Sequence, residues 1–195
     1  LMAKLIEALR DDTKLILNIK NGDNSAFRTL IERYEPQVAA TVVGMLGVCP
    51  EAQDVGQEVF VRFYRSLDKF RGEAAIGTYL TRIAINLSLN ELKRRKLQRQ
   101  RFVTNINLLN NLKDRTDDLA AAESSYIIYT ALSKIKPEFR KVIVLRLING
   151  FSTKETAHII KIPQGTVLSR LTRGQKILRD ILMEEGRKHG KENNA

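Results

Sequence analysis

Three carboxylates at helical spacing are the first candidates for chemistry in this chain of 195 residues. Glu51, Asp54 and Glu58 are three and four residues apart, so a helix would place them on one face. Such a group could hold a divalent cation or act as a general acid and base. The sequence places neither of its two histidines near them. We therefore favour a protein-docking surface with Phe60 as an exposed anchor, although a merely solvated face fits the same pattern.

A basic stretch, residues 82–101, is the second candidate. It contains seven Lys or Arg and one Glu, which gives +6 of the formal net charge of +11. On a helix, Tyr79, Arg82, Asn86 and Lys93 would share one face. An aromatic ring, an amide and cations in a row can stack bases and follow a phosphate backbone. The alternative, in which Tyr79 packs into the core and the charges are solvated, stays open from these residues alone.

The third candidate is the stretch Ile162–Leu178, which combines apolar helical spacing with hydroxyls and cations. Just before it, residues 152–155 read Ser-Thr-Lys-Glu, a capping-box pattern that predicts a short helix with Ala157 and Ile160 inward. The segment from Lys161 to Pro163 then breaks this helix. Two short helices around a tight turn are typical of a DNA-binding helix-turn-helix, and a solvated amphipathic helix is the alternative.

The second helix of this unit has one apolar and one polar side. Val167, Leu171, Gly174 and Leu178 recur at i, i+4, i+7 and i+11 and predict the buried stripe. Short hydroxyls and long cations on the other side can hydrogen-bond base edges in the major groove and the phosphates beside it. These polar residues are Thr166, Ser169, Arg170, Arg173 and Lys176.

The elements that must position these groups are predicted to be helical. Apolar residues recur at helical spacing in nearly every segment, for example from Phe27 to Val38, and strand patterns are nearly absent. Scattered asparagines and mixed charges then mark a linker in the middle of the chain. The predicted fold class is all-α, with two small helical domains joined by a flexible linker. The domains are residues 14–98 and 125–185, and the linker is residues 99–124.

Composition limits the partners and the compartment. The net charge of +11 and a pI near 9.9 favour a polyanion or an anionic surface as partner. Cys49 is the only cysteine, so an internal disulfide and a thiolate metal cluster are excluded and a reducing cytoplasm is expected. No apolar run approaches the ~20 residues of a membrane span, and Leu1–Leu9 lacks the features of a signal peptide.

Three ordered blocks resemble the extracytoplasmic-function (group IV) branch of the sigma-70 family. They are GDNSAFRTLIERY at residues 22–34, AQDVGQEVFVRFYRSLDKFRGEAAIGTYLTRIAINLSLNELKRR at 52–95 and PEFRKVIVLRLINGFSTKETAHIIKIPQGTVLSRLTRGQKIL at 137–178. The resemblance implies a region 2 and a region 4 domain that bind core RNA polymerase and direct it to promoters. It also implies an anti-sigma factor, often membrane-bound, as a partner. With this resemblance we expect no catalytic residues, no metal and no cofactor.

The resemblance also implies roles for individual residues. Asp54, Gln57, Glu58 and Phe60 match the segment that docks on the clamp helices of the polymerase beta-prime subunit. The loop from Phe70 to Thr78 matches the part that melts and captures the minus-10 element, and region 4 is expected to read the minus-35 element and contact the polymerase beta flap. The expected minus-10 residues are Tyr79, Arg82, Asn86, Asn90 and Lys93, and the expected minus-35 residues are Thr166, Ser169, Arg170, Thr172, Arg173 and Lys176.

Four residues depart from the family pattern. Tyr79 stands where the family usually has tryptophan, and Gly56 lies within a predicted helix, where it costs up to ~1 kcal/mol relative to alanine. Lys161 occupies the usual turn glycine, so the turn is expected to be strained or to use a different backbone conformation. Leu168 replaces a frequent Lys or Arg, so the minus-35 sequence that relatives prefer does not carry over to this chain.

Two functions outside this family fit parts of the sequence. A stand-alone helix-turn-helix regulator would bind duplex DNA without polymerase, usually as a dimer on palindromic half-sites. The sequence offers no obvious dimer helix, and this function leaves the basic stretch at residues 82–101 unexplained. A metal-dependent nuclease would use Glu51, Asp54 and Glu58, and a Mg²⁺ titration of DNA cleavage would identify it.

Overall fold

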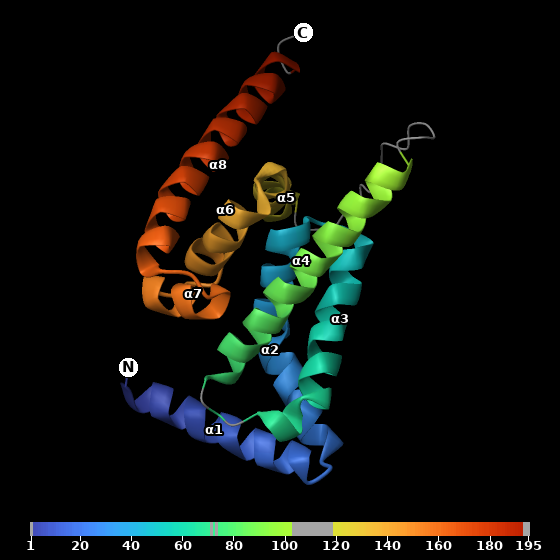
Figure 1. Ribbon diagram of the computed structural model, residues 1–195, viewed down its shortest axis with the longest axis vertical. Coiled ribbons are helices and arrows are strands. Elements are labelled where there is room, and N and C mark those ends of the chain that lie inside the picture. Colours follow the sequence, from blue (N-terminus) through green and yellow to red (C-terminus); the bar gives the residue numbers. More distant parts are fainter. Residues whose placement is uncertain (1, 71, 73, 103–118, 193–195) are drawn as a thin grey trace.

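The computed structural model describes residues 2–70, 72, 74–102 and 119–192, and every regular element in these residues is helical (Figure 1). The predicted all-α fold is therefore confirmed. The elements are α1 (Met2–Lys20), α2 (Asn24–Leu46), α3 (Pro50–Arg65), the 3₁₀ turn η1 (Leu67–Lys69), α4 (Ile76–Phe102), α5 (Leu119–Lys134), α6 (Pro137–Ile143), the π-helical turn η2 (Val144–Ile148), α7 (Thr153–Ile160) and α8 (Gln164–Glu192).

Helices replace both ends of the predicted linker. α4 runs on to Phe102 and α5 begins at Leu119, so residues 99–102 and 119–124 are helical. The middle of the predicted linker, residues 103–118, lies outside the described residues.

α2, α3 and α4 form the bundle of the N-terminal half, and their predicted apolar stripes face one another. Leu30 of α2, Val59 of α3 and Leu80 of α4 are fully buried. α4 approaches α2 closely at Gly77, where a Cβ atom would lie 2.8 Å from Oε1 of Gln37. A larger residue at position 77 would therefore force the side chain of Gln37 to move and would crowd Tyr34 of α2.

Asp23 caps the N-terminus of α2, as the sequence predicts for the turn at residues 22–25. Its Oδ1 accepts hydrogen bonds from the backbone N–H groups of Ser25 at 2.8 Å and Ala26 at 3.2 Å. The hydroxyl of Ser25 also donates to it, and these three bonds hold the pKa of Asp23 below its ordinary value. The start of α2 is therefore fixed by residues that are adjacent to it in the sequence.

α1 crosses one end of the bundle and is attached to it by a buried carboxylate (Figure 1). Asp12 is 8% exposed, and it accepts hydrogen bonds from Nη1 of Arg33 at 2.9 Å and from the hydroxyl of Tyr34. Burial and the bond to Asp12 raise the pKa of Tyr34, so Tyr34 remains a neutral donor. Asp12 thus fixes α1 on α2 through a charged and a neutral partner.

The C-terminal half is built on a close contact between α6 and α8. A Cβ atom on Gly174 would lie 2.9 Å from Cδ1 of Ile143, so the glycine allows the two helices to touch. Leu132 of α5, Ile135 and Ile143 form the buried core of this half. Ile177 and Leu178 of α8 cover that core from outside.

The two halves are packed against each other and share one core. Val144, Leu145 and Ile159 belong to the same cluster of buried side chains as Leu30 and Phe63 of the N-terminal half. α2 contacts α5, α6 and η2, and α4 contacts α7. The sequence left the relative arrangement of the halves open, and the structure fixes it through these contacts.

Replacing Asp12 with alanine should lower the free energy of unfolding by about 1.5–3 kcal/mol, because its carboxylate accepts part-buried hydrogen bonds from Arg33 and Tyr34 that alanine cannot accept. Denaturant titration followed by circular dichroism measures the change. Asp11→Ala is the matched control, because Asp11 is the neighbour of Asp12 on α1 and is itself exposed. Equal stabilities of the two variants would contradict the role of Asp12.

Candidate nucleic-acid interface

α7 begins with the predicted capping box. Oγ of Ser152 accepts from the backbone N–H of Glu155 at 3.2 Å, and Oε2 of Glu155 accepts from the backbone N–H of Ser152 at 2.7 Å. The bonds from Ser152 lower the pKa of Glu155 below its ordinary value. The first helix of the helix-turn-helix is therefore fixed at its start by reciprocal bonds.

The buried side of α7 differs from the side that the sequence predicts. Thr156 and Ile159 are buried, whereas the predicted inward residues, Ala157 and Ile160, are only partly covered. The prediction missed Thr156 because a polar residue does not count in an apolar pattern.

Lys161 then ends α7 in the left-handed region, with φ 53° and ψ 53°, which costs a non-glycine residue about 1 kcal/mol or more. The expected strain in this turn is thus present.

α8 presents a polar surface on the side away from α6. Val167 and Gly174 are buried as predicted, and they orient the helix. The hydroxyl of Ser169 donates to the carbonyl of Thr166 at 3.1 Å, and that of Thr172 donates to the carbonyl of Leu168 at 3.1 Å. Both oxygens keep free lone pairs. Of the predicted residues, Ser169, Thr172, Arg173 and Lys176 are exposed, and Thr166 and Arg170 are half-buried.

Arg170 adds to a local excess of positive charge beside α8. Lys141 of α6 lies close enough that its pKa is lowered, first by burial and then by the charge of Arg170. In the described residues neither cation forms an ion pair with a carboxylate. The polar side of α8 therefore lies in a positive potential that favours an anionic partner.

The exposed side of α4 carries the second set of predicted residues. Asn86, Asn90 and Lys93 are exposed, and Tyr79 and Arg82 are half-buried. Two amides and a cation are thus available to hydrogen-bond base edges and phosphates along one helix.

Tyr79 packs with other aromatic rings instead of standing free. Its ring meets Phe70 edge-on with centroids 5.2 Å apart and Phe63 with centroids 5.9 Å apart. Its hydroxyl donates to Oγ of Ser66 at 3.3 Å, and the guanidinium of Arg82 lies 5.0 Å from the ring centroid. Tyr79 therefore packs against the core with part of its ring, remains half-buried, and lies beside the guanidinium of Arg82.

The predicted acidic face of α3 forms, but two of its carboxylates are paired. Oε1 of Glu58 lies 2.8 Å from Nε of Arg62, and Oε2 of Glu51 lies 3.3 Å from Nη2 of Arg95. Asp54 is exposed on the same side. Within the described ranges, no three His, Cys, Asp or Glu side chains are placed to share a metal ion. This face has the character of a charged protein surface.

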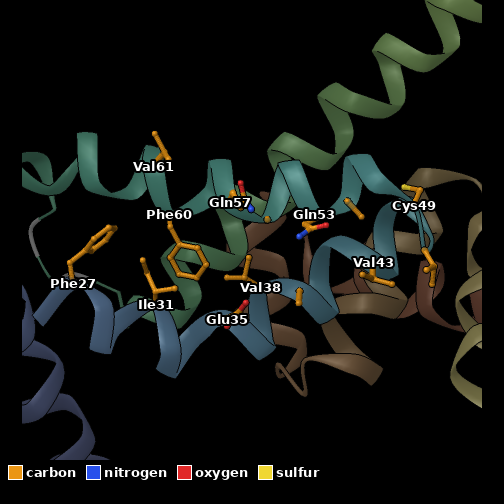
Figure 2. Close-up of a pocket in the computed structure, with 14 residues that line it drawn as sticks. Phe27, Ile31, Glu35, Val38, Val43, Cys49, Gln53, Gln57, Phe60 and Val61 are labelled. Carbon is orange, nitrogen blue, oxygen red and sulfur yellow. The ribbon is translucent and has the colours of Figure 1, made fainter. Parts of the chain in front are cut away.

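Phe60 is not the exposed anchor that the sequence suggested. It is 7% exposed, and its ring points towards α2 between Ile31 and Val38 (Figure 2). The reason is that position 60 lies on the border between the acidic face and the buried stripe of α3, and α2 covers that border.

An apolar groove of about 520 Å³ lies between α2 and α3, and the sequence did not reveal it. Phe60 lies inside this groove, and Gln57 lies at its edge (Figure 2). Gly56 is one of its lining residues, and a Cβ atom there would meet no atom within 4 Å, so a side chain at this position would project into open space. The only signal in the sequence was a glycine within a helix. The groove is lined by Phe27, Ile31, Glu35, Val38, Ala39, Val43, Val48, Cys49, Ala52, Gln53, Gly56, Gln57, Phe60 and Val61.

Comparison with known proteins identifies both halves. The family model for sigma-70 region 2 matches residues 30–98, and the model for sigma-70 region 4 matches residues 125–178. The first range contains all residues of the groove except Phe27, together with the α4 surface, and the second contains the helix-turn-helix.

Relatives match along nearly the whole chain. The chain is 29% identical to the RNA polymerase sigma-H factor of Pseudomonas aeruginosa over 186 residues, covering 89% of this chain and 96% of the relative. It is 30% identical to the ECF RNA polymerase sigma factor SigW of Bacillus subtilis over 180 residues, covering 88% and 96%. It is also 30% identical to the ECF RNA polymerase sigma-E factor of Escherichia coli K12 over 177 residues, covering 86% and 92%.

Two solved structures share the fold. The sigma factor RpoE in complex with the anti-sigma factor NepR from Bartonella quintana matches with a TM-score of 0.64 and 20% identity, over 80% of this chain and 96% of that one. CnrH in complex with the cytosolic domain of CnrY matches with a TM-score of 0.65 and 25% identity, over 89% and 98%.

The chain therefore belongs to the sigma-70 family. Within that family it is an extracytoplasmic-function sigma factor, a protein that binds core RNA polymerase and directs transcription initiation at promoters. Sigma factors are generally not enzymes, and a stand-alone regulator is not favoured. In the part of the chain that the structure describes, no helix is both long and apolar enough to cross a membrane.

Acidification should lower the stability of the helix-turn-helix, because it protonates the carboxylate of Glu155. Its folded pKa is lower than the ordinary 4.5, so its contribution to stability is complete above about pH 4.5 and is lost as the pH falls through the folded pKa. The melting temperature of the parent protein should therefore fall more steeply than that of Glu155→Gln between about pH 5 and pH 3. Parallel pH profiles would contradict the capping role.

Proposed function

We propose that each exposed surface described above performs one step of promoter recognition. The α2–α3 groove with the acidic face of α3 binds polymerase, α4 binds the minus-10 element and α8 binds the minus-35 element. The observation that supports this division most strongly is that the polar groups of α4 and of α8 are exposed on two separate helices, each fixed by a buried opposite side. The polymerase supplies the catalysis, and this chain has no catalytic activity of its own.

For polymerase docking, the groove and the acids complement each other. Asp54 and Gln57 are exposed beside the groove, and Glu58 is partly exposed despite its ion pair with Arg62. A helix of the beta-prime clamp would place apolar side chains in the groove above Phe60 and its cations against the acids. In this arrangement Phe60 contributes as an apolar wall within the groove.

For the minus-10 element, we propose that Asn86, Asn90 and Lys93 contact the separated strand, with Arg82 held for the same purpose by Tyr79. Amides can hydrogen-bond unpaired base edges, and the cations can follow the phosphates. A hollow of about 200 Å³ beside Phe70 and Ile76 is near the start of α4, and an unstacked base is the ligand that we assign to it.

For the minus-35 element, the position of a residue along α8 decides whether it contacts bases or phosphates. Recognition helices contact base edges mainly with their N-terminal residues. We therefore assign Thr166, Ser169 and Arg170 to bases, and the exposed Thr172, Arg173 and Lys176 to the phosphate backbone. Leu168 is 53% exposed on the same helix, and an apolar side chain there suits a thymine methyl group.

Regulation by a second protein fits the same surfaces. Two structural neighbours are sigma factors in complexes with anti-sigma factors. We propose that this chain also has an anti-sigma factor, that this factor is membrane-bound, and that it covers the α2–α3 groove. The sigma factor itself acts in the cytoplasm.

Transcription with purified components tests the function as a whole. Core polymerase with this chain should start transcripts at defined positions on genomic DNA, whereas core polymerase alone should not. No co-elution of the chain with core polymerase in gel filtration would contradict the function.

Reversing the charge at Asp54 and Glu58 together should weaken core binding by at least about tenfold, because two attractive charges at the docking surface become repulsive. Fluorescence anisotropy with core polymerase measures the affinity. Reversal of the exposed Asp11 and Glu32 is the matched control for net charge. Equal affinities of the two double variants would refute the docking assignment, and circular dichroism checks that both remain helical.

Lys176→Ala should weaken binding to cognate and random duplexes alike and reduce the salt dependence of log K by about 1, as expected for one lost phosphate contact. Arg170→Ala should instead reduce the preference for the cognate minus-35 duplex by about 1–3 kcal/mol. Lys20→Ala, an exposed cation of α1, is the control. The same loss of preference in both α8 variants would contradict the division into base and phosphate contacts.

A further inference from the structure

A cleft of about 370 Å³ lies between α4 and the C-terminal half. One of its walls comes from α4, and the other comes from α6, α7 and the turn after α7. A volume of this size is typical of sites that bind small molecules. The cleft is lined by Arg82, Ile85, Asn86, Leu89, Lys141, Ile159, Ile160 and Lys161.

Three of the lining residues are cations, and none is an acid. Arg82 comes from α4, Lys141 from α6 and Lys161 from the turn after α7, so both walls contribute positive charge. Among the described residues, no carboxylate forms an ion pair with any of the three. Cations that converge without a counter-charge repel one another and attract an anion.

The environment of Lys141 agrees with a positive potential in this cleft. Lys141 is half-buried, and its pKa is lowered first by burial and then by the charge of Arg170. The charge of Glu138 acts in the opposite direction and is the smallest of the three causes. The charged form of Lys141 is therefore disfavoured in the free protein, and an anion bound beside it would offset this cost.

The guanidinium of Arg82 is positioned before any ligand binds. It lies 5.0 Å from the ring centroid of Tyr79, and this ring packs edge-on against Phe63 and Phe70. A guanidinium held on an aromatic ring can still donate two parallel hydrogen bonds to a phosphate. One turn further along α4, Asn86 adds an exposed amide to the same wall.

Lys161 occupies a turn position at which glycine would be free of strain, because its φ of 53° lies in the left-handed region. The backbone N–H groups of Lys161 and Ile162 both donate to the carbonyl of Ala157, so the turn is fixed without any side chain. A lysine here therefore costs stability and in return places a positive charge at the cleft. The geometry of the turn does not account for this charge, whereas an anionic ligand does.

The rest of the lining is apolar. Ile85 and Ile159 are buried, and Leu89 and Ile160 are half-buried. Apolar side chains beside cations suit a ligand with a flat apolar part and a charged part, which is the chemistry of a nucleotide. A terminal phosphate carries about −1.5 to −2 at pH 7, and an inner phosphate adds further negative charge, so a diphosphate group matches three cations.

We propose that this cleft is a binding site for a nucleoside diphosphate. Arg82, Lys141 and Lys161 bind the two phosphates, and the base lies against the apolar lining. The site goes beyond promoter recognition and does not depend on it. Because Arg82 and Asn86 also belong to the proposed minus-10 surface, the bound nucleotide and the separated strand exclude each other. Only this last consequence rests on the function proposed above.

Lys161→Gly tests the site in the full-length protein, because glycine removes one cation and keeps the left-handed turn without strain. Isothermal titration calorimetry with adenosine diphosphate and guanosine diphosphate, at constant ionic strength and without divalent cations, measures the affinity. The variant should bind about tenfold more weakly than the parent, as expected for one lost charge-assisted hydrogen bond. Its melting temperature should be no lower than that of the parent, which separates weaker binding from misfolding. Lys161→Arg keeps the charge and should retain the affinity.

Lys154→Ala is the matched control, since it removes an exposed cation of α7 that does not line the cleft. Its affinity for both diphosphates should equal that of the parent. Pyrophosphate should bind the parent more weakly than either nucleotide, because it has no apolar part. The site is refuted if the parent binds neither nucleotide at millimolar concentration, if Lys154→Ala and Lys161→Gly lose equal affinity, or if pyrophosphate binds as tightly as the nucleotides.

Competition separates this site from the proposed function. The nucleotide that binds should weaken binding of a short random single strand to the parent, but not to Lys161→Gly at the same concentration. If binding depends on Lys161 and the strand affinity nevertheless stays constant, the nucleotide site stands and the proposed minus-10 role of Arg82 and Asn86 is wrong. The calorimetry contains neither DNA nor polymerase, so its result holds whatever transcription assays show.

Discussion

α2 constrains the rest of the structure, because nearly every side of this helix is in contact with another element. Its middle holds α1 through Asp12 and meets α4 at Gly77, and its last turns meet the C-terminal half at Gly44. Its remaining side forms the apolar groove with α3. A helix packed in this way cannot shift without disturbing several contacts, so the groove and the α4 surface keep a fixed geometry relative to each other.

Some positively charged side chains of this protein are held in ion pairs that support the fold, and others are free to contact DNA. In the basic stretch at the end of α4, Arg94 and Arg95 both bind Glu91, at 2.7 and 2.9 Å, and these bonds lower the pKa of that carboxylate. Arg95 also reaches Glu51. Arg95 is therefore partly committed to holding α4 against α3, whereas Arg94 is paired within α4. The net positive charge available to DNA lies on other residues, such as Lys93 of α4 and Arg173 of α8.

Much of the fold and of the candidate surfaces was predictable from local patterns. The caps at Asp23 and Ser152 and the buried position of Val167 follow from residue types at fixed spacing. Prediction failed where a residue lies on the border of a stripe. Phe60 is covered by α2 and Tyr79 by Phe70, and neither neighbour is close to it in helical spacing. Periodicity shows which side of a helix is apolar, but not how far the next helix covers it.

The sequence by itself determined the helices, their caps, the turn of the helix-turn-helix and the family of the protein, because each depends on residues close together in the chain. Only the tertiary structure decided which of these residues are exposed, where a groove remains, and how the halves meet. Gly44 and Gly56 illustrate the reason. Both are glycines within helices, yet a Cβ atom on Gly44 would lie 2.8 Å from Val144 of the other half, whereas one on Gly56 would meet no atom within 4 Å. That difference depends on atoms that are distant in the sequence, so no local pattern contains it.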